Sequence, residues 1–260
     1  MKLALLVEYD GTVYHGFQRQ APAHEPTIQG MLETAVERIS QQRVAVLGAG
    51  RTDTGVHASG QVVHFQVESR LRPHDWQRAL NAVLPADIAV RRIAPVADAF
   101  HARYSALARS YRYDVLANPW PSPLRERFVH RVAYPLDVEM MDAGCAALLG
   151  EHDFRAFGRS PRGPDASCVR VMLEASCQRD ERAALISFTF TANGFLNGMV
   201  RRLVGTLLLV GQGQLGVTEF VRILESRNDA HPGAAAPACG LCLTQVSYPA
   251  GMVIWDDMES

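Results

Sequence analysis

The sequence predicts an α+β fold of two similar halves that share a mostly antiparallel sheet. Its 260 residues, 48% of them hydrophobic, are enough for one large domain or two closely associated halves. The predicted strands alternate apolar and polar side chains, which is typical of strands with one solvated face and not of buried parallel sheets. Helical apolar stripes follow strands in both halves in the same rhythm.

The first half begins with a predicted strand that ends at Asp10-Gly11. A helix is then expected from Thr27, a suitable N-cap residue, because apolar side chains recur at helical spacing from 28 to 39. A second helix is expected to start near Pro73. The strands expected in this half cover residues 3–8, 61–67, 88–93 and 109–116.

The second half follows a segment, 117–123, that contains three prolines and is expected to be a linker. We therefore divide the chain into residues 1–118 and 119–260. Helices are predicted over 136–149, 196–208 and 218–225, and strands over 185–192 and 240–246. The glycines at 211, 213 and 216 match a dinucleotide-binding pattern, but too little chain follows for that fold, so we expect them to end a helix.

Composition excludes several classes of function. Lys2 is the only lysine among 26 basic residues, which removes the Gly-Lys of a P-loop and the buried amine of Schiff-base chemistry. The nine histidines form no metal-binding motif, so we expect no metal site. The net charge of -1 gives no global argument for a nucleic-acid partner.

The cellular compartment is predicted from the cysteines and from the apolar segments. Five cysteines, an odd number in a chain long enough for its own core, favour a reducing, cytoplasmic compartment. No stretch approaches the ~18 apolar residues of a membrane span. Glu8 and Asp10 come too early for a signal peptide.

The densest polar stretch is Gly-Ala-Gly-Arg-Thr-Asp-Thr-Gly-Val-His-Ala at 48–58. Glycines on both sides of Arg51 and Asp53 allow tight turns and close approach of a ligand. An ordinary hairpin loop with a solvated ion pair would also fit. Asp-Thr-Gly occurs in aspartic proteases too, but this chain would need a homodimer, and Arg51 would oppose proton sharing between the two carboxyl groups.

This stretch, with the Gly-Gln-Val-Val-His-Phe that follows at 60–65, resembles the catalytic block of the tRNA pseudouridine synthase A family. Further segments resemble the family in order over about residues 3–249. They are Glu-Tyr-Asp-Gly-Thr at 8–12 with Gly-Phe-Gln-Arg-Gln at 16–20, Asp-Ala-Phe-His-Ala-Arg at 98–103, Arg-Ser-Tyr-Arg-Tyr at 109–113, Phe-Leu-Asn-Gly-Met-Val-Arg at 195–201 and Gly-Leu-Cys-Leu at 240–243.

The resemblance implies a cofactor-free isomerase that breaks the C1'–N1 bond of a uridine, turns the uracil and rejoins it through C5. It implies uridines 38 to 40 of the tRNA anticodon arm as targets. Asp53 matches the essential aspartate, acting as nucleophile or as base on the sugar. Tyr111 matches a tyrosine that stacks on the uracil, Arg201 a basic residue that pairs with the aspartate, Leu241 a wall of the uracil pocket, and Arg51 an arginine that holds the flipped-out nucleotide.

The residue types suit this chemistry, although periodicity alone does not select them. A paired arginine keeps an aspartate ionised in a closed pocket, and an aromatic face stabilises an extruded base. Without the resemblance, Tyr111 and Leu241 would be read as core residues, and nothing distinguishes Arg201 from Arg202. Thr54 stands where the family more often has alanine, and the Asn-Gly pair at 197–198 replaces a bulkier pair.

We therefore expect two ferredoxin-like α/β halves with a basic active-site cleft between them. The first half would supply Asp53, and the second Arg201 and Leu241. The resemblance implies a homodimer that binds tRNA across both subunits; a tRNA-binding protein without catalysis is the alternative. Residues 91–131 hold eight arginines against three acids, so a basic, phosphate-binding surface is predicted despite the neutral total.

Overall fold

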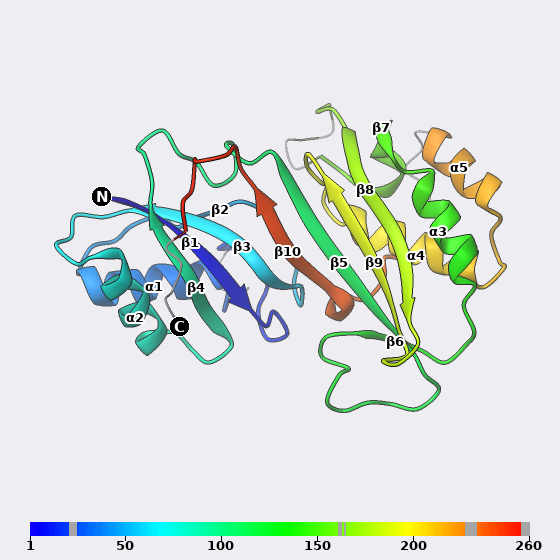
Figure 1. The fold of residues 1–260 in the computed structure, drawn as a ribbon, viewed down its shortest axis with the longest axis horizontal. Helices are drawn as coiled ribbons and strands as arrows, with labels where there is room; N and C mark the ends of the chain where they lie inside the picture. The colour runs from blue at the N-terminus through cyan, green and yellow to red at the C-terminus, as the bar shows by residue number, and fades with distance from the viewer. Residues whose placement is uncertain (21–24, 161–162, 164, 227–232, 256–260) are drawn as a thin grey trace. The chain divides into compact units, whose positions relative to one another are not determined.

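The structure is a computed structural model that describes the whole chain except residues 21–24, 161–162, 164, 227–232 and 256–260 (Figure 1). The described residues form a mixed α+β protein with ten strands, mostly antiparallel, and five α-helices. They divide into two compact units, the first made of Met1–Leu107 with Leu243–Ser260 and the second of Ala108–Cys242. None of the described helices has the length and apolar character needed to cross a membrane.

These units differ from the division that we expected at 118/119. Strand β5 (Ala108–Ala117) belongs to the second unit because it pairs with β9 (Leu185–Ala192) along its whole length, from Arg109 opposite Ala192 to Leu116 opposite Leu185. The last strand, β10 (Leu241–Ser247), neighbours β3 (His57–Gln66), so the chain returns to the first unit at its end. The proline-rich segment therefore lies inside the second unit.

The first unit has the strand order β4–β1–β3–β10, in which β1 (Lys2–Tyr9) pairs antiparallel with both β3 and β4 (Ile88–Pro95). The short β2 (Leu47–Gly48) pairs with β3 just before the polar loop. Helix α1 (Ile28–Ser40) begins where predicted, with the Thr27 side chain accepting a hydrogen bond from the Gly30 N–H. Helix α2 (Pro73–Val83) begins at its proline.

One face of strand β1, with Leu3, Leu5, Val7 and Tyr9, is buried, and Ala4 on the other face is buried too, which explains its nearly continuous apolar sequence. Phe65 packs edge-on against Trp76 of α2, with ring centroids 5.5 Å apart. On the opposite face a core cluster joins β1 and β3 to the segment after β4 and to the end of the chain; it contains Ala4, Ala49, Val62, Phe100 and Ala102, with Tyr248 and Trp255 packed against it. Lys2, the only lysine, donates to the carbonyl oxygens of Asp98 and Phe100 at 2.6 and 2.7 Å.

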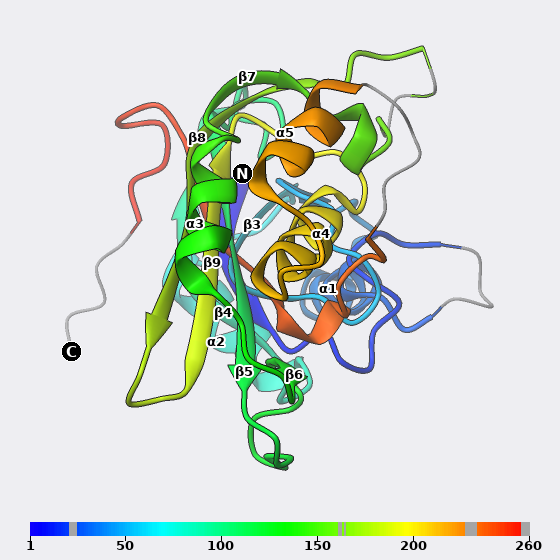
Figure 2. The ribbon, with the colours of Figure 1, turned by 90° about the vertical axis from the view of Figure 1, so that its right-hand side faces the viewer.

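The second unit has the strand order β5–β9–β8–β7, with β8 (Val169–Asp180) and β7 (Gly150–Asp153) antiparallel, and β6 (His130–Val132) parallel to β5. Figure 2 shows α3 (Val138–Ala146), α4 (Met199–Gly211) and α5 (Val217–Ser226) on one side of these strands. Helix α4 ends at Gly211, as predicted for the glycine-rich segment.

Strand β8 is the longest of four strands that sequence periodicity missed; the others are the short β2, β6 and β7. Its register with β9 shifts between Met172 and Glu174, so the alternation of inward and outward side chains is broken there. Leu173 is 57% exposed, whereas Met172 and Cys177 are buried. A strand with so few buried apolar positions gives a weak period-two signal.

Candidate active site

Asp53 lies in the loop between β2 and β3, and its exposed side chain alternates with buried neighbours. Arg51 and Thr54 are exposed as well, whereas Thr52 and Val56 are 6% and 1% exposed. The N–H of Val56 donates to the carbonyl oxygen of Asp53 at 3.1 Å, which closes a tight turn through Gly55. Gly55 has a φ of +77°, so the glycine that follows Thr54 is required by the backbone.

The opening segment, residues 10–17, packs directly against this loop. The N–H of Phe17 donates to the carbonyl oxygen of Thr52 at 3.0 Å. Gly16 has a φ of +84°, and a Cβ there would lie 2.6 Å from the same oxygen. A Cβ at Gly11 would overlap the Val56 carbonyl oxygen. The two glycines of the opening segment thus permit close backbone contact with the residues on either side of Asp53.

Helix α1 holds the opening segment in place at its N-terminus. The Ile28 and Gln29 N–H groups, which lack partners inside the helix, donate to the carbonyl oxygens of Gly16 and Phe17 at 3.2 and 2.9 Å. The chain of contacts therefore runs from the start of α1 through residues 16–17 to Thr52. It fixes the backbone immediately before Asp53.

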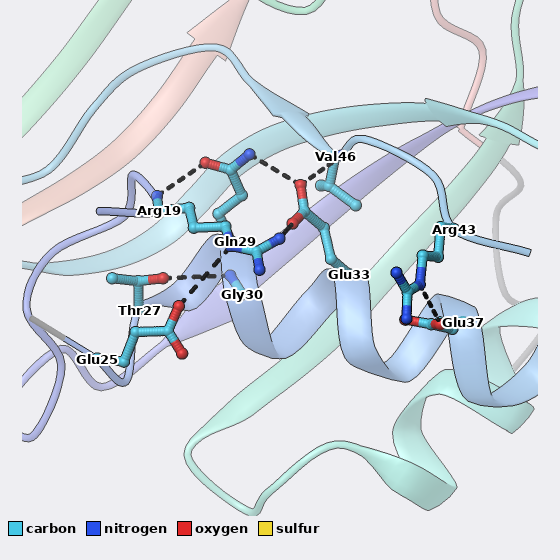
Figure 3. Close-up of polar contacts among 9 residues, drawn as sticks. All are labelled: Arg19, Glu25, Thr27, Gln29, Gly30, Glu33, Glu37, Arg43 and Val46. Carbon is cyan, nitrogen blue, oxygen red and sulfur yellow. Dashed lines mark hydrogen bonds and ion pairs between the residues drawn. The ribbon is translucent and has the colours of Figure 1, made fainter. Parts of the chain in front are cut away.

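A polar cluster around Glu33 strengthens this connection (Figure 3). One Glu33 oxygen accepts from the Gln29 side chain at 2.9 Å and from the Val46 N–H at 3.1 Å, and the other accepts from Arg19 at 3.2 Å. The Gln29 side-chain oxygen in turn accepts from the Arg19 N–H at 2.9 Å. The helix, the opening segment and the chain that enters β2 are thus joined through one carboxylate.

Arg201 lies in the first turn of α4, in the second unit, and fastens the segment that precedes Leu241. Its Nε donates to the carbonyl oxygen of Ala236 at 2.7 Å, and the Ala236 N–H donates to the Arg201 carbonyl oxygen at 2.8 Å. Leu241 follows at the start of β10 and is 5% exposed. The structure thus brings the segments of Arg201 and Leu241 together.

Tyr113 holds the same segment from the strand side. Its hydroxyl donates to the carbonyl oxygen of Pro237 at 2.9 Å, and a Cβ at Gly240 would lie 2.7 Å from its ring. Burial raises the pKa of Tyr113, with the Cys239 thiol adding to the effect and the Arg201 guanidinium opposing it. The hydroxyl therefore stays protonated and remains a donor.

Tyr111 is mostly buried in the second unit. It is 7% exposed, on the same face of β5 as the fully buried Tyr113 and Val115, and opposite Phe190 in the strand register. Its ring lies edge-on to Phe195, with centroids 5.0 Å apart at 84°. This packing provides the ring with rigid support from the segment that leads to Arg201.

The Asn-Gly pair before α4 has a structural explanation. Gly198 is the N-cap residue of α4 and has a φ of +69°, a left-handed conformation that favours glycine. The carbonyl oxygen of Asn197 accepts from Arg202 at 3.2 Å. Arg202 therefore caps the turn that precedes the helix, whereas Arg201 binds the Ala236 segment.

The predicted site residues fall in two groups. Arg51 and Asp53 share one loop of the first unit, and Tyr111, Arg201 and Leu241 belong to the second. The cleft expected between the halves stays a prediction. Sequence reasoning assigned no role to Tyr9, Thr52 and Gln61, three buried polar residues that contact the Asp53 loop or belong to it. A glutamine in an otherwise apolar predicted strand was the available signal.

Comparison with known proteins identifies the family. The profile of the family described as tRNA pseudouridine synthase matches residues 5–105 and 145–249. A tRNA pseudouridine synthase A from Thermosynechococcus vestitus is 45% identical over 249 residues, covering 95% of this chain and 86% of its own. Proteins of the same name from Chloroflexus aurantiacus and Acetivibrio thermocellus are 44% and 40% identical, covering 97% and 94% of this chain and 91% and 98% of their own. The chain therefore belongs to the tRNA pseudouridine synthase A family, isomerases that convert uridine to pseudouridine in tRNA.

Proposed function

We propose that this enzyme isomerises uridines at positions 38 to 40 of the tRNA anticodon stem-loop, with Asp53 as the catalytic aspartate and without a cofactor. The reaction breaks the C1'–N1 bond and forms a C1'–C5 bond. The C5 proton is lost and N1 gains a proton, so substrate and product are isomers and no oxidant or reductant is needed. A carboxylate that acts on the nucleotide is the group such a reaction requires.

The observation that carries the proposal is the setting of Asp53. Its carboxylate is on an exposed turn, whereas Thr52 and Val56 on either side are buried, and the backbone of Thr52 and Gly55 is hydrogen-bonded to the opening segment. A solvent-facing side chain on a fixed backbone can meet a nucleotide with little loss of conformational freedom. An ordinary surface loop with a solvated ion pair would not need this support.

The remaining site residues receive roles consistent with their surroundings. Arg201 would pair with Asp53 and keep it ionised once RNA excludes water from the site. Tyr111 would stack on the uracil, Leu241 would form a wall of its pocket, and Arg51 would hold the extruded nucleotide, whose flipping costs a few kcal/mol. These roles require the basic cleft between two ferredoxin-like halves.

The assembly and the compartment are part of the same proposal. A homodimer would bind one tRNA across both subunits, in the reducing cytoplasm. The thiols of Cys145 and Cys177 fit that compartment, because burial raises the pKa of both and keeps them protonated. Both are core residues at 0% and 3% exposure.

The test is pseudouridine mapping by carbodiimide adduct and primer extension on unmodified tRNA transcripts. Wild-type enzyme should mark uridines 38 to 40, and Asp53→Asn should lower the rate by at least ~10³-fold, as loss of an essential catalytic group does. Asp75→Asn, the same change at the start of α2 and outside the loop, should keep wild-type activity.

Three outcomes would contradict the proposal in whole or in part. Activity that survives Asp53→Asn would overturn the catalytic assignment. Wild-type protein that binds tRNA but leaves no adduct would favour the alternative, a tRNA-binding protein without catalysis. Adducts only outside the anticodon arm would confirm that the enzyme forms pseudouridine but would contradict uridines 38 to 40 as its targets.

A further inference from the structure

Three buried polar side chains join the Asp53 loop to the strands of the first unit. Tyr9, at the end of β1, is 3% exposed, Gln61 on β3 is fully buried, and Thr52 is 6% exposed. Buried polar groups of this kind cost free energy unless each finds a partner. Their contacts converge on Gly50 and Thr52, three positions and one position before Asp53.

The Gln61 side chain makes two hydrogen bonds to the backbone of Gly50. Its amide nitrogen donates to the Gly50 carbonyl oxygen at 2.7 Å, and its amide oxygen accepts from the Gly50 N–H at 3.2 Å. A side-chain amide therefore pairs with a peptide group as a neighbouring strand would. The chain is held beyond the end of β2, where regular pairing with β3 has already stopped.

Thr52 is hydrogen-bonded through both its side chain and its backbone. Its Oγ1 lies 2.8 Å from the Tyr9 hydroxyl, and its carbonyl oxygen accepts from the Phe17 N–H at 3.0 Å. The Gln61 amide nitrogen also donates to the Tyr9 hydroxyl, at a long 3.5 Å. Gln61 thus contacts both Gly50 and Tyr9, and the Tyr9 hydroxyl joins Gln61 to Thr52.

We infer that Tyr9, Thr52 and Gln61 are positioning residues for Asp53, an inference that rests on the proposed catalytic role of that carboxylate. They fix the backbone of residues 50 and 52 on either side of the exposed Arg51. The peptide that carries Asp53 is thereby fixed too. A displacement of ~1 Å in a reacting group costs up to ~100-fold in rate, so loosening this network should lower kcat.

The experiment compares variants that remove one hydroxyl each. Tyr9→Phe and Thr52→Val should lower the single-turnover rate of pseudouridine formation by roughly 10- to 100-fold, with the tRNA Kd within about threefold of wild type. Thr52→Ser keeps the oxygen and should restore the rate to within about threefold of wild type. The double variant should lose no more than the worse single variant, because both remove the same hydrogen bond.

A matched control separates positioning from general loss of stability. Tyr248→Phe also removes the hydroxyl of a tyrosine of the first unit, but that hydroxyl donates to the carbonyl oxygen of Ala102, outside the loop and the opening segment, at 2.7 Å. Its rate should stay within about twofold of wild type even if its Tm falls as far as that of Tyr9→Phe.

The outcomes distinguish this inference from the proposed function. Wild-type rates in Tyr9→Phe and Thr52→Val, with Asp53→Asn inactive, would overturn the positioning role and leave the catalytic assignment intact. A loss in Tyr248→Phe equal to that in Tyr9→Phe would also overturn it. No pseudouridine from the wild-type enzyme would overturn both.

Discussion

His64 shows how a single buried polar residue shapes the first unit. It is 4% exposed on β3, and its Nδ1 accepts from the Ala102 N–H at 3.2 Å. Its ring lies 4.8 Å from that of His101. Burial lowers the pKa of His64 to about 4, helped by the charges of His101 and Lys2. The imidazole is therefore neutral in the folded protein at neutral pH.

A neutral buried histidine makes stability fall in mild acid. Below the ordinary pKa of histidine, near 6.5, the unfolded chain takes up a proton that folded His64 refuses until about pH 4. The free energy of unfolding should therefore fall as pH drops from 7 to 5. In His64→Asn, which keeps an acceptor for Ala102, the fall should be smaller by about 1 kcal/mol.

Denaturant unfolding of both proteins at pH 7 and pH 5 checks this prediction. His74→Asn, at an exposed position of α2, should keep the wild-type pH dependence. Burial also lowers the pKa of His101, so part of the slope should remain in His64→Asn. An unchanged slope in His64→Asn would contradict the assignment.

At the scale of elements, the site depends on backbone packed against backbone. The opening segment reaches the Asp53 loop through glycines, and helix α1 holds that segment by its first N–H groups. Side chains contribute little bulk at these contacts. Substitutions that add only a methyl group are therefore the sharpest test of the arrangement.

Gly16→Ala should destabilise the protein more than Gly213→Ala. Both glycines have positive φ, +84° and +71°, so both substitutions incur the left-handed penalty of about 1–2 kcal/mol. Only at Gly16 would the new Cβ meet an atom, the Thr52 carbonyl oxygen at 2.6 Å; at Gly213 nothing lies within 4 Å. We expect an additional cost of about 1–3 kcal/mol at Gly16, measured by denaturant unfolding. An equal loss in the free energy of unfolding for both variants would show that the opening segment moves to accommodate the new methyl group.

Elements with one clean apolar face could be predicted from the sequence, and elements defined by distant partners could not. Helix α1 with its Thr27 cap and strand β9 match their predicted positions closely. Strand β8 was not predicted, because a register shift interrupts the alternation of its side chains. The compact units of the structure do not divide at 118/119, since β5 pairs with β9 and the last strand returns to β3.

The site residues, too, divide into those that could be predicted from the sequence and those that could not. The glycines around Arg51 and Asp53 marked the loop, because turn chemistry is local in sequence. Tyr9 lies 43 positions from its partner Thr52 in the sequence, and Gln61 lies 11 positions from Gly50. Arg201 and Ala236 are 35 positions apart. Such pairs leave no periodic trace, so the family resemblance alone selected Tyr111, Arg201 and Leu241.

For the whole molecule, the neutral net charge conceals an uneven distribution along the chain. Residues 91–131 hold eight arginines against three acids, and 215–260 hold two arginines against six acids, some of them outside the described residues. Ion pairs in this stretch include Arg91 with Glu8, Arg112 with Asp114 and Arg131 with Glu126, at 3.5, 2.9 and 3.0 Å. Exposed pairs of this kind contribute about 0–1 kcal/mol, so phosphates can compete with the carboxylates for these arginines.

Binding of tRNA should therefore be strongly salt-dependent despite the net charge of -1. With two or more phosphate contacts, each releasing counterions, Kd should rise about tenfold or more between 50 and 200 mM KCl. Arg127→Gln, in the basic stretch, should lower the slope of log Kd against log salt by about 1, whereas Arg222→Gln, exposed on α5 in the acidic stretch, should leave it unchanged. Filter binding over a salt series measures both slopes. A Kd that barely changes with salt would mean that the arginines of residues 91–131 do not contact the RNA backbone. The surface that binds tRNA would then be as close to neutral as the whole chain.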